Sequence, residues 1–278
     1  MKRRWLKVLV VLSVLVGGGY LTLCGLAYKY QDRLIYFPDD YFPQDPASAG
    51  LEFEDFELDT GQGNTVTGWV VKSEPQAPWV LLFHGNAGNI SSRVDYLKLF
   101  HDLGYNSAVF DYRGYGRSKG TPTEEGLVAD GAAVVKYLKE KHQVSENYLI
   151  YFGESLGGGV AAALAVNEPP RALILKSTFT SLVDISSDVY PFLPSGLLLR
   201  SRYPTKEAIA TFLFPKLIIH GRSDTIIPFA HGQRLFQGAG EPKTFLEIYG
   251  GHNTGPLELG AEFKNALKEF IDGAIPQE

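Results

Sequence analysis

The 278-residue chain is long enough to bury a sizeable hydrophobic core, and its proportions of hydrophobic (45%) and charged (21%) residues are close to globular averages. Length and composition therefore exclude a short peptide, a disordered polymer and a bundle of membrane helices. The formal net charge of −5 divides into +5 for residues 1–33 and −10 for the remainder, and an acidic body without a basic stripe argues against nucleic acid as a partner.

The first predicted element is a helix that spans a membrane over residues 8–28. These 21 residues carry no charge, and as a helix they would be about 31 Å long, close to the roughly 30 Å of a bilayer's hydrocarbon core. Four basic residues precede the span, whereas only Lys29 and Arg33 follow it closely. The positive-inside rule then predicts a cytoplasmic flank and single-pass anchor over 1–33. The rest of the chain would lie on the non-cytoplasmic side, which is the periplasm or cell exterior if the source is a bacterium and an organelle lumen if it is a eukaryote.

Three other interpretations of this segment remain open: a cleaved secretory signal, lipidation at Cys24, and a helix buried in the core. The sequence Leu21-Thr22-Leu23 before Cys24 lacks the small residues that signal cleavage and lipoprotein processing require. The length of the apolar stretch and its flanking charges disfavour a core helix. A single cysteine also rules out a disulfide within the chain.

Residues 34–50 are rich in Tyr, Phe and Pro and lack a regular hydrophobic period. We therefore interpret them as a linker that lies on the following domain, with aromatic side chains that either pack there or contact the membrane interface. From residue 51 to 278, short apolar runs alternate with longer helical patterns. The expected strands have the sequences TGWVV, APWVLLFHG, YNSAVFDYRG, NYLIYFG, RALILKS, PKLIIHG and TFLEIYG, and the expected helices include residues 91–103, 124–141, 155–166 and 230–237. This alternation indicates one α/β domain with a mostly parallel sheet covered on both faces.

The pattern Gly153-Glu154-Ser155-Leu156-Gly157 stands directly between an expected strand and an expected helix. In a nucleophile elbow, a side chain at either glycine position would strike the neighbouring strand or helix. The sharp turn would expose the Ser155 hydroxyl at a helix N-terminus, where the helix dipole favours developing negative charge. The bare pattern also occurs by chance, but its place between strand and helix predicts that Ser155 is a catalytic nucleophile.

The interval 178–212 breaks the alternation of strands and helices. It is too irregular for one crossover helix and is conspicuously apolar, so we interpret it as a small cap. Ligands of open α/β sheets bind beyond the carboxyl ends of the strands, and an apolar insertion there would roof a pocket for an acyl chain. The alternative is an amphipathic crossover with no role in substrate binding.

Serine is a weak nucleophile at neutral pH and needs a base within hydrogen-bond reach. Of the six histidines, His252 is the best candidate, because it follows the last expected strand in the loop Gly250-Gly251-His252-Asn253, beyond Ser155 in the chain. His84 and His220 also end expected strands. The other histidines lie in or at the start of expected helices, namely His101, His142 and His231.

The third member of such a set is a carboxylate that fixes the imidazole tautomer and stabilises the imidazolium. Asp224 follows the strand KLIIH and lies between the nucleophile and the base in the order Ser, Asp, His. Asp111 precedes Ser155, and we expect it to anchor its own loop by pairing with Arg113 or Arg117. The remaining candidates are two acidic residues of the cap, Asp184 and Asp188.

Tetrahedral intermediates need two amide donors aimed at the oxyanion. One is expected to be the backbone N–H of Leu156, the residue after the nucleophile. The other is expected from the loop in WVLLFHGNAGN, with the backbone N–H of Asn86 as the best candidate and Gly85 and Gly88 allowing close approach to a substrate. A glycine-rich turn without catalytic role is the alternative.

The ordered motifs HGNAGN, DYRGYGRSKG, GESLGG, GRSDTIIP and GGHN, preceded by an anchor and LIYFP, resemble the α/β-hydrolase-fold serine hydrolases. More narrowly, the chain is similar to a membrane-anchored branch that includes uncharacterised bacterial hydrolases and eukaryotic depalmitoylating relatives. The resemblance covers the chain from about Leu34 to its end, and implies the α/β-hydrolase fold and a Ser–His–Asp triad. The chain lacks the N-terminal cysteine cluster of the depalmitoylating relatives, which argues against a cytosolic depalmitoylase.

Residues and resemblance together predict a serine hydrolase that cleaves carboxylic esters or thioesters of an acyl or lipophilic substrate through an acyl-enzyme on Ser155. The expected partners are this substrate and the bilayer around residues 8–28, with neither a metal nor an organic cofactor. A serine peptidase or amidase of the same fold is the alternative, since the same triad cleaves amides. From other classes, a membrane-tethered scaffold would usually lack a triad residue. A metal hydrolase built on His84, His220 and His252 lacks H-x-H or H-E-x-x-H spacing.

Overall fold

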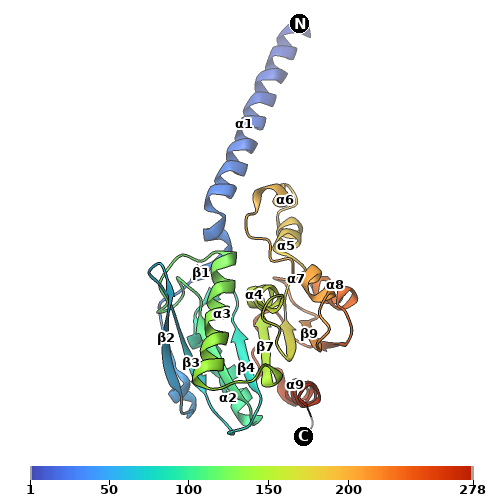
Figure 1. Ribbon diagram of the computed structural model, residues 1–278. Coiled ribbons are helices and arrows are strands. Elements are labelled where there is room, and N and C mark those ends of the chain that lie inside the picture. The colour runs from blue at the N-terminus through green and yellow to red at the C-terminus, as the bar shows by residue number, and fades with distance from the viewer. Residues whose placement is uncertain (1, 277–278) are drawn as a thin grey trace.

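An eight-stranded sheet forms the centre of the body, in the order β10-β9-β8-β7-β4-β6-β3-β2 (Figure 1). The structure is a computed structural model that describes residues 2–276. Strands β4 and β6 to β10 are parallel, whereas β3 is antiparallel to β6 and β2 is antiparallel to β3. The mostly parallel sheet is therefore confirmed, with an antiparallel edge.

The strands are β1 (Phe37–Pro38), β2 (Glu54–Gly61), β3 (Asn64–Val71), β4 (Trp79–Phe83), β5 (Ala87–Gly88), β6 (Asn106–Asp111), β7 (Leu149–Glu154), β8 (Ala172–Lys176), β9 (Lys216–Gly221) and β10 (Lys243–Ile248). The α-helices are α1 (Lys2–Ile35), α2 (Val94–Asp102), α3 (Glu124–Lys141), α4 (Leu156–Ala165), α5 (Leu182–Val189), α6 (Ser195–Leu198), α7 (Thr205–Ala210), α8 (Phe229–Gly238) and α9 (Gly260–Ala274). Short 3₁₀ helices cover Pro46–Ala49, Ile90–Arg93 and Glu146–Tyr148.

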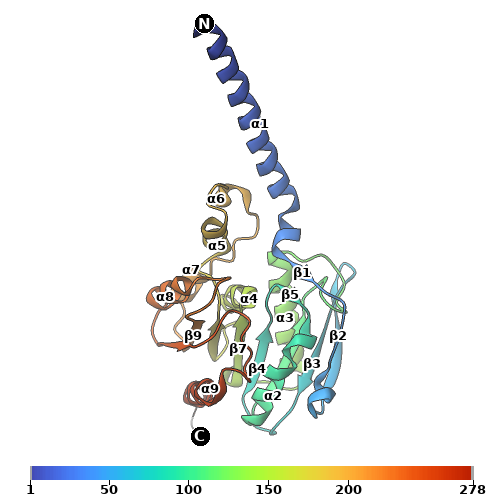
Figure 2. The ribbon, with the colours of Figure 1, turned by 180° about the vertical axis from the view of Figure 1, so that it is seen from behind.

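Both faces of the sheet are covered by helices, which explains the continuous apolar runs of its strands. Helices α3, α4 and α8 lie on one face, and α2 and α9 lie on the other, as the front and back views show (Figures 1 and 2). All five residues of β4 are buried. A strand buried on both faces cannot alternate polar with apolar side chains, so its sequence reads WVLLF.

Helix α1 is longer than the predicted span of 8–28, because it runs without a break from Lys2 to Ile35. Its 34 residues extend over about 51 Å. It is long and apolar enough to cross a membrane, and its most apolar stretch is almost entirely exposed. The segment expected as a linker over 34–50 thus begins with the last helical residues and continues into β1, which pairs with β5.

The interval between β8 and β9 is folded into three short helices, α5, α6 and α7. Helices α5 and α6 stand beyond the carboxyl ends of the parallel strands, beside the lower part of α1 (Figure 1). We call residues 178–212 the cap.

Candidate active site

Ser155 lies in a sharp turn between β7 and α4, with φ of 55° and ψ of −119°. This left-handed backbone conformation is strained for a residue with a side chain. The turn depends on its two glycines. A Cβ at Gly153 would lie 2.5 Å from the Gly158 Cα, and one at Gly157 would lie 2.0 Å from the Phe83 carbonyl oxygen. The local geometry is that of a nucleophile elbow.

The structure brings Ser155, His252 and Asp224 together, as expected from the sequence. The His252 Nε2 atom lies 3.0 Å from the Ser155 Oγ, and its Nδ1 lies 2.8 Å from the Asp224 Oδ2. Because a carboxylate accepts hydrogen bonds, the Nδ1–H of His252 donates to Asp224, and Nε2 is left to accept the proton of the serine hydroxyl.

Asp224 is held by its own loop. Its Oδ1 accepts hydrogen bonds from the backbone N–H groups of Ile226 (2.9 Å) and Ile227 (2.8 Å). Burial alone would raise the pKa of Asp224, but the hydrogen bond and charge of His252 and these two amides lower it below its usual value. The carboxylate is therefore kept ionised where it faces His252.

Two other histidines, His220 and His231, hold loops and helices together. His220 Nε2 lies 2.9 Å from the Ile227 carbonyl oxygen and 3.5 Å from the Asp224 Oδ2, so this imidazole supports the Asp224 loop. His231 joins the cap to α8, with Nδ1 3.1 Å from the Thr180 backbone nitrogen and Nε2 3.0 Å from the Asp188 Oδ2. Burial lowers the pKa of both histidines. Asp184 accepts from the Thr180 hydroxyl, so both acidic residues of the cap have local partners.

The expected pairing of Asp111 with Arg113 or Arg117 is wrong. Arg113 binds Asp130 at 2.7 Å, while Arg117 faces Asp55 at 4.0 Å. Arg113 thus pairs with a buried carboxylate of α3 and Arg117 faces an exposed one of β2, and neither arginine pairs with Asp111, which is completely buried.

Asp111 instead faces the loop that follows β4. Its Oδ1 accepts the Ile90 N–H at 2.9 Å and lies 3.6 Å from the His84 Nε2. The His84 Nδ1–H donates to the Gly85 carbonyl oxygen at 2.7 Å. Burial raises the pKa of Asp111 to about 7 and lowers that of His84 to about 3. Burial therefore favours the uncharged form of both side chains.

The two expected amide donors lie on either side of Ser155. Leu156 begins α4, and a Cβ at Gly85 would lie 3.5 Å from the Ser155 Cβ, which places the 84–88 loop beside the serine. The Asn86 carbonyl oxygen accepts from the Phe37 N–H and the Tyr115 hydroxyl, each at 2.9 Å. Within residues 2–276, the N–H groups of Asn86 and Leu156 donate to no protein acceptor. Both amides are therefore free to bind an oxygen of a ligand.

A buried ionic cluster beneath the elbow was not expected from the sequence. Glu154 Oε1 lies 3.0 Å from the Lys176 Nζ, and its Oε2 lies 2.9 Å from the Arg93 Nε. Burial would raise the pKa of Glu154, but the charges of Arg93 and Lys176 lower it to about 2. The lysine of RALILKS, Lys176, is the residue from which this cluster could have been predicted, because a cation at the end of an otherwise apolar strand needs a buried partner of opposite charge.

A cavity of about 400 Å³ opens above Ser155, between the cap, α1 and the loops of the sheet. This volume falls within the range of small-molecule sites. Among the described residues, those that line it include no Asp, Glu, Lys or Arg. They are Ala27, Gln31, Leu34, Ile35, Asn86, Ser155, Leu156, Phe179, Leu182, Ile185, Ser186, Val189, Tyr190, Phe192, Leu193, Ser195, Leu198, Leu199, Ile226 and Ile227.

Several known proteins are similar to this chain in sequence over most of its length. An uncharacterized protein of Mycobacterium tuberculosis (strain CDC 1551 / Oshkosh) is 40% identical over 266 residues, 94% of this chain and 93% of that protein. The alpha/beta hydrolase domain-containing protein WAV2 of Arabidopsis thaliana is 31% identical over 296 residues, 96% of each chain. The chain belongs to the α/β-hydrolase family. A family model described as serine aminopeptidase, S33, matches residues 74–209 of this α/β hydrolase, a segment that contains Ser155 but ends before Asp224 and His252.

The fold of this α/β hydrolase is also that of solved structures. The esterase Pf2001 of Pyrococcus furiosus has a TM-score of 0.72 at 20% identity, covering 86% of this chain and 97% of that chain. At this identity the likeness concerns the fold. It agrees with the mostly parallel sheet and the helices on both faces.

Proposed function

We propose that this α/β hydrolase cleaves carboxylic esters or thioesters of apolar acyl groups through a Ser155–His252–Asp224 triad. The observation that carries the proposal is His252, which is hydrogen-bonded to both Ser155 (3.0 Å) and Asp224 (2.8 Å). Ser155 in turn lies at the floor of a cavity whose lining, among the described residues, carries no charged side chain. A strained serine at a helix N-terminus, a base and an orienting carboxylate are the parts that acyl transfer requires.

The reaction proceeds in two steps. The Ser155 Oγ attacks the acyl carbon while its proton passes to His252 Nε2, and the alcohol or thiol leaves with that proton. Water then attacks the acyl-enzyme, giving a proton to His252, and the acid departs as Ser155 regains its hydrogen. Asp224 holds the imidazole tautomer and stabilises the imidazolium. The amides of Asn86 and Leu156 donate to the oxyanion of each tetrahedral intermediate.

The lining of the cavity favours an ester or thioester over a peptide with a free amino terminus. The matching family model is described as a serine aminopeptidase. An aminopeptidase must bind an ammonium group, and burying a cation without a partner is costly. Among the described residues, no carboxylate lines this cavity. An apolar acyl group, in contrast, loses water-exposed surface when it enters.

Helix α1 is proposed to anchor the enzyme in a membrane by a single pass, with its N-terminus in the cytoplasm and the catalytic domain on the opposite side. The support is the exposure and length of the apolar helix, and the basic residues that precede the span. A topology assay tests this orientation: a cysteine-reactive, membrane-impermeant label is expected to reach a Cys placed at Leu213, an exposed position, from outside the cell.

A fluorophosphonate probe tests the mechanism. The wild-type protein is expected to be labelled, whereas Ser155→Ala and His252→Ala should lose labelling. Ser187→Ala is a matched control, because Ser187 is an exposed serine of the cap with a hydrogen bond only to the Val183 carbonyl oxygen within the described residues. Labelling that survives in Ser155→Ala would contradict the proposed nucleophile. An intact wild type without labelling or ester hydrolysis would favour a non-catalytic scaffold.

A further inference from the structure

One wall of the cavity above Ser155 belongs to helix α1. Ala27, Gln31, Leu34 and Ile35 line this wall, and their positions i, i+4, i+7 and i+8 place them on one face of the helix. The cap supplies the opposite wall, and Figures 1 and 2 show α5 and α6 beside the lower half of α1. Helix α1 is therefore part of the cavity as well as an anchor.

The contact between α1 and the cap continues into the predicted membrane span. The Tyr20 hydroxyl donates to the Phe192 carbonyl oxygen at 2.8 Å, and Cys24, one turn further along α1, is only 8% exposed. Tyr20 and Gln31 are about 16 Å apart along the helix axis. The part of the cap at residues 189–198, which we call the cap tip, thus reaches a level of α1 that lies within residues 8–28.

The cap tip is apolar and open to its surroundings. Residues 189–198 contain no charged side chain. Four of their large side chains are between 50% and 85% exposed, namely Val189, Tyr190, Phe192 and Leu197. The neighbouring stretch of α1 also exposes leucines, namely Leu21, Leu23 and Leu26. Exposed apolar surface of this kind is typical of sites that contact a protein or a membrane, and its continuity with a helix long enough to cross a membrane favours lipid here.

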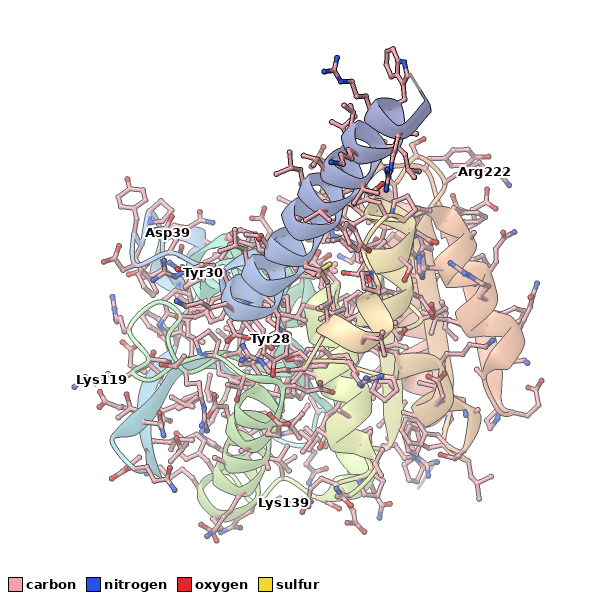
Figure 3. The ribbon with its side chains drawn as sticks, turned by 90° about the horizontal axis from the view of Figure 1, so that it is seen from above. Tyr28, Tyr30, Asp39, Lys119, Lys139 and Arg222 are labelled. Carbon is pink, nitrogen blue, oxygen red and sulfur yellow. The ribbon has the colours of Figure 1, made fainter. Side chains whose placement is uncertain are left out.

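Aromatic and basic side chains gather below the cap tip. Lys29 and Arg33 lie over the Tyr30 ring, 5.3 and 5.8 Å from its centroid, and Arg200 lies over Tyr28 at 5.4 Å. Figure 3 shows Tyr28 and Tyr30 on the lower part of α1. Such residues are typical of the boundary between a membrane and water. With the membrane boundary at this level, the cap tip and the upper cavity would lie on its bilayer side.

We propose that the cap tip inserts into the leaflet beside α1, and that the cavity takes the acyl chain of a long-chain ester lipid directly from the bilayer. This inference rests on the proposed function, since Ser155 must be the nucleophile at the cavity floor. The bond from Ser155 Oγ to the acyl carbon forms, and the bond from that carbon to the lipid's alkoxy oxygen breaks. The alcohol leaves with the proton held by His252, and water then releases the fatty acid.

The role of α1 is tested with Ala27→Trp in full-length protein reconstituted into phosphatidylcholine vesicles. The new indole occupies space between α1 and the cap, where the acyl chain would lie. Excluding a few methylene groups is expected to lower the ratio of 1-palmitoylglycerol to p-nitrophenyl acetate hydrolysis at least about tenfold. Leu26→Trp is the matched control, because Leu26 is the adjacent helical residue, is 50% exposed and does not line the cavity. This variant should keep the wild-type ratio.

Two outcomes would overturn the proposal. If Ala27→Trp reduces the hydrolysis of both substrates equally, or if both variants keep the wild-type ratio, α1 is not a wall of the acyl site. If an S-palmitoyl peptide in the same vesicles is hydrolysed faster than the glyceryl ester, the substrate is not a lipid ester. Failure of the proposed function has a different signature, since hydrolysis would then persist in Ser155→Ala.

Insertion of the cap tip is tested with an environment-sensitive fluorophore on a cysteine at Phe192 in a Cys24→Ala background. Blue-shifted emission in vesicles is expected for this probe. A cysteine at Leu213, which is 87% exposed and lies just before the amino end of β9, at the opposite end of the sheet from the cap tip, should report water. Water-like emission from both probes would overturn the insertion.

Discussion

At the scale of single residues, three side chains from distant parts of the chain meet because each follows the carboxyl end of a parallel strand. Ser155 follows β7, Asp224 follows β9 and His252 follows β10, and these three strands lie in the same half of the sheet. Residue type and position after a strand were enough to predict this meeting. The ion pair of Glu154 with Lys176 was not predicted, because it depends on which buried charges face one another.

The first prediction concerns Asp224→Asn. The amide keeps the shape of the carboxylate but cannot both accept from the Nδ1–H of His252 and stabilise its positive charge. We expect kcat to fall by about 10⁴-fold in ester hydrolysis, with folding retained. Asp188→Asn provides the control, because Asp188 also binds a histidine, His231, yet lies in the cap. A comparable loss in both variants would contradict the role of Asp224.

The second prediction concerns the pH dependence of stability at Asp111. Its pKa is raised from 3.8 to about 7 by burial, so the folded protein binds this proton more tightly than the unfolded chain. The stability that this proton contributes is complete below pH 4 and is lost as pH rises through 7. Asp111→Asn keeps an acceptor for the Ile90 N–H and removes the titration.

Urea unfolding in detergent micelles at pH 5, 6, 7 and 8 is the measurement. Relative to wild type, Asp111→Asn should gain roughly 1.4 kcal/mol of stability for each pH unit between pH 5 and 7, and the gain should then level off. A difference between the two proteins that does not change with pH would contradict a raised pKa at Asp111.

At the scale of elements, the strands buried on both faces were predicted well, and α3 has the expected bounds of 124–141. Strand β2 was missed because it is an edge strand in which six of eight residues between Glu54 and Gly61 are charged, threonine or glycine. Helix α9 was also missed, although its buried Phe263, Leu267 and Ile271 recur every four residues. The β-bulges and helix-capping contacts that set the exact first and last residues of strands and helices depend on tertiary contacts.

The third prediction concerns the packing of α4 against β4. A methyl group at Gly157 would lie 2.0 Å from the Phe83 and 2.5 Å from the His84 carbonyl oxygen, and backbone cannot move aside easily. We expect Gly157→Ala to lower the free energy of unfolding by about 3 kcal/mol or more. Gly273→Ala in α9 has nothing within 4 Å and should stabilise slightly, through better helix propensity. Equal thermal midpoints for the two variants would contradict this account.

At the scale of the whole molecule, α1 is joined to the cap and to the catalytic loops. Gln31 is 2% exposed, and its amide bonds to the Leu198 carbonyl oxygen at 3.1 Å and the Arg200 N–H at 2.7 Å. Asp32 forms an ion pair with Arg200 at 2.6 Å. The sequence indicated an anchor and a cap but not their contact, because a polar residue just past an apolar span gives no sign of its partner.

The fourth prediction concerns this contact. Gln31→Ala leaves the Leu198 carbonyl and the Arg200 N–H without their partner, which costs about 1–3 kcal/mol of local stability. Amide hydrogen exchange in residues 195–201 should then become roughly 5- to 150-fold faster, while exchange in the sheet remains as in wild type. Gln44→Ala removes a hydrogen bond to the Ser91 carbonyl, away from the cap, and serves as the control. Unchanged exchange in residues 195–201 of Gln31→Ala would show that α1 does not hold the cap.

The unbroken course of α1 has a mechanical consequence. The helix continues to Ile35, whose carbonyl accepts a hydrogen bond from the Asn86 side chain at 3.0 Å, while the Phe37 N–H donates to the Asn86 carbonyl. A span longer than the local hydrocarbon thickness tilts, and a rod without a hinge tilts at both ends. In the proposed membrane-anchored enzyme, the loop next to Ser155 would therefore be coupled to bilayer thickness, and one sequence would work at different rates in thick and thin membranes.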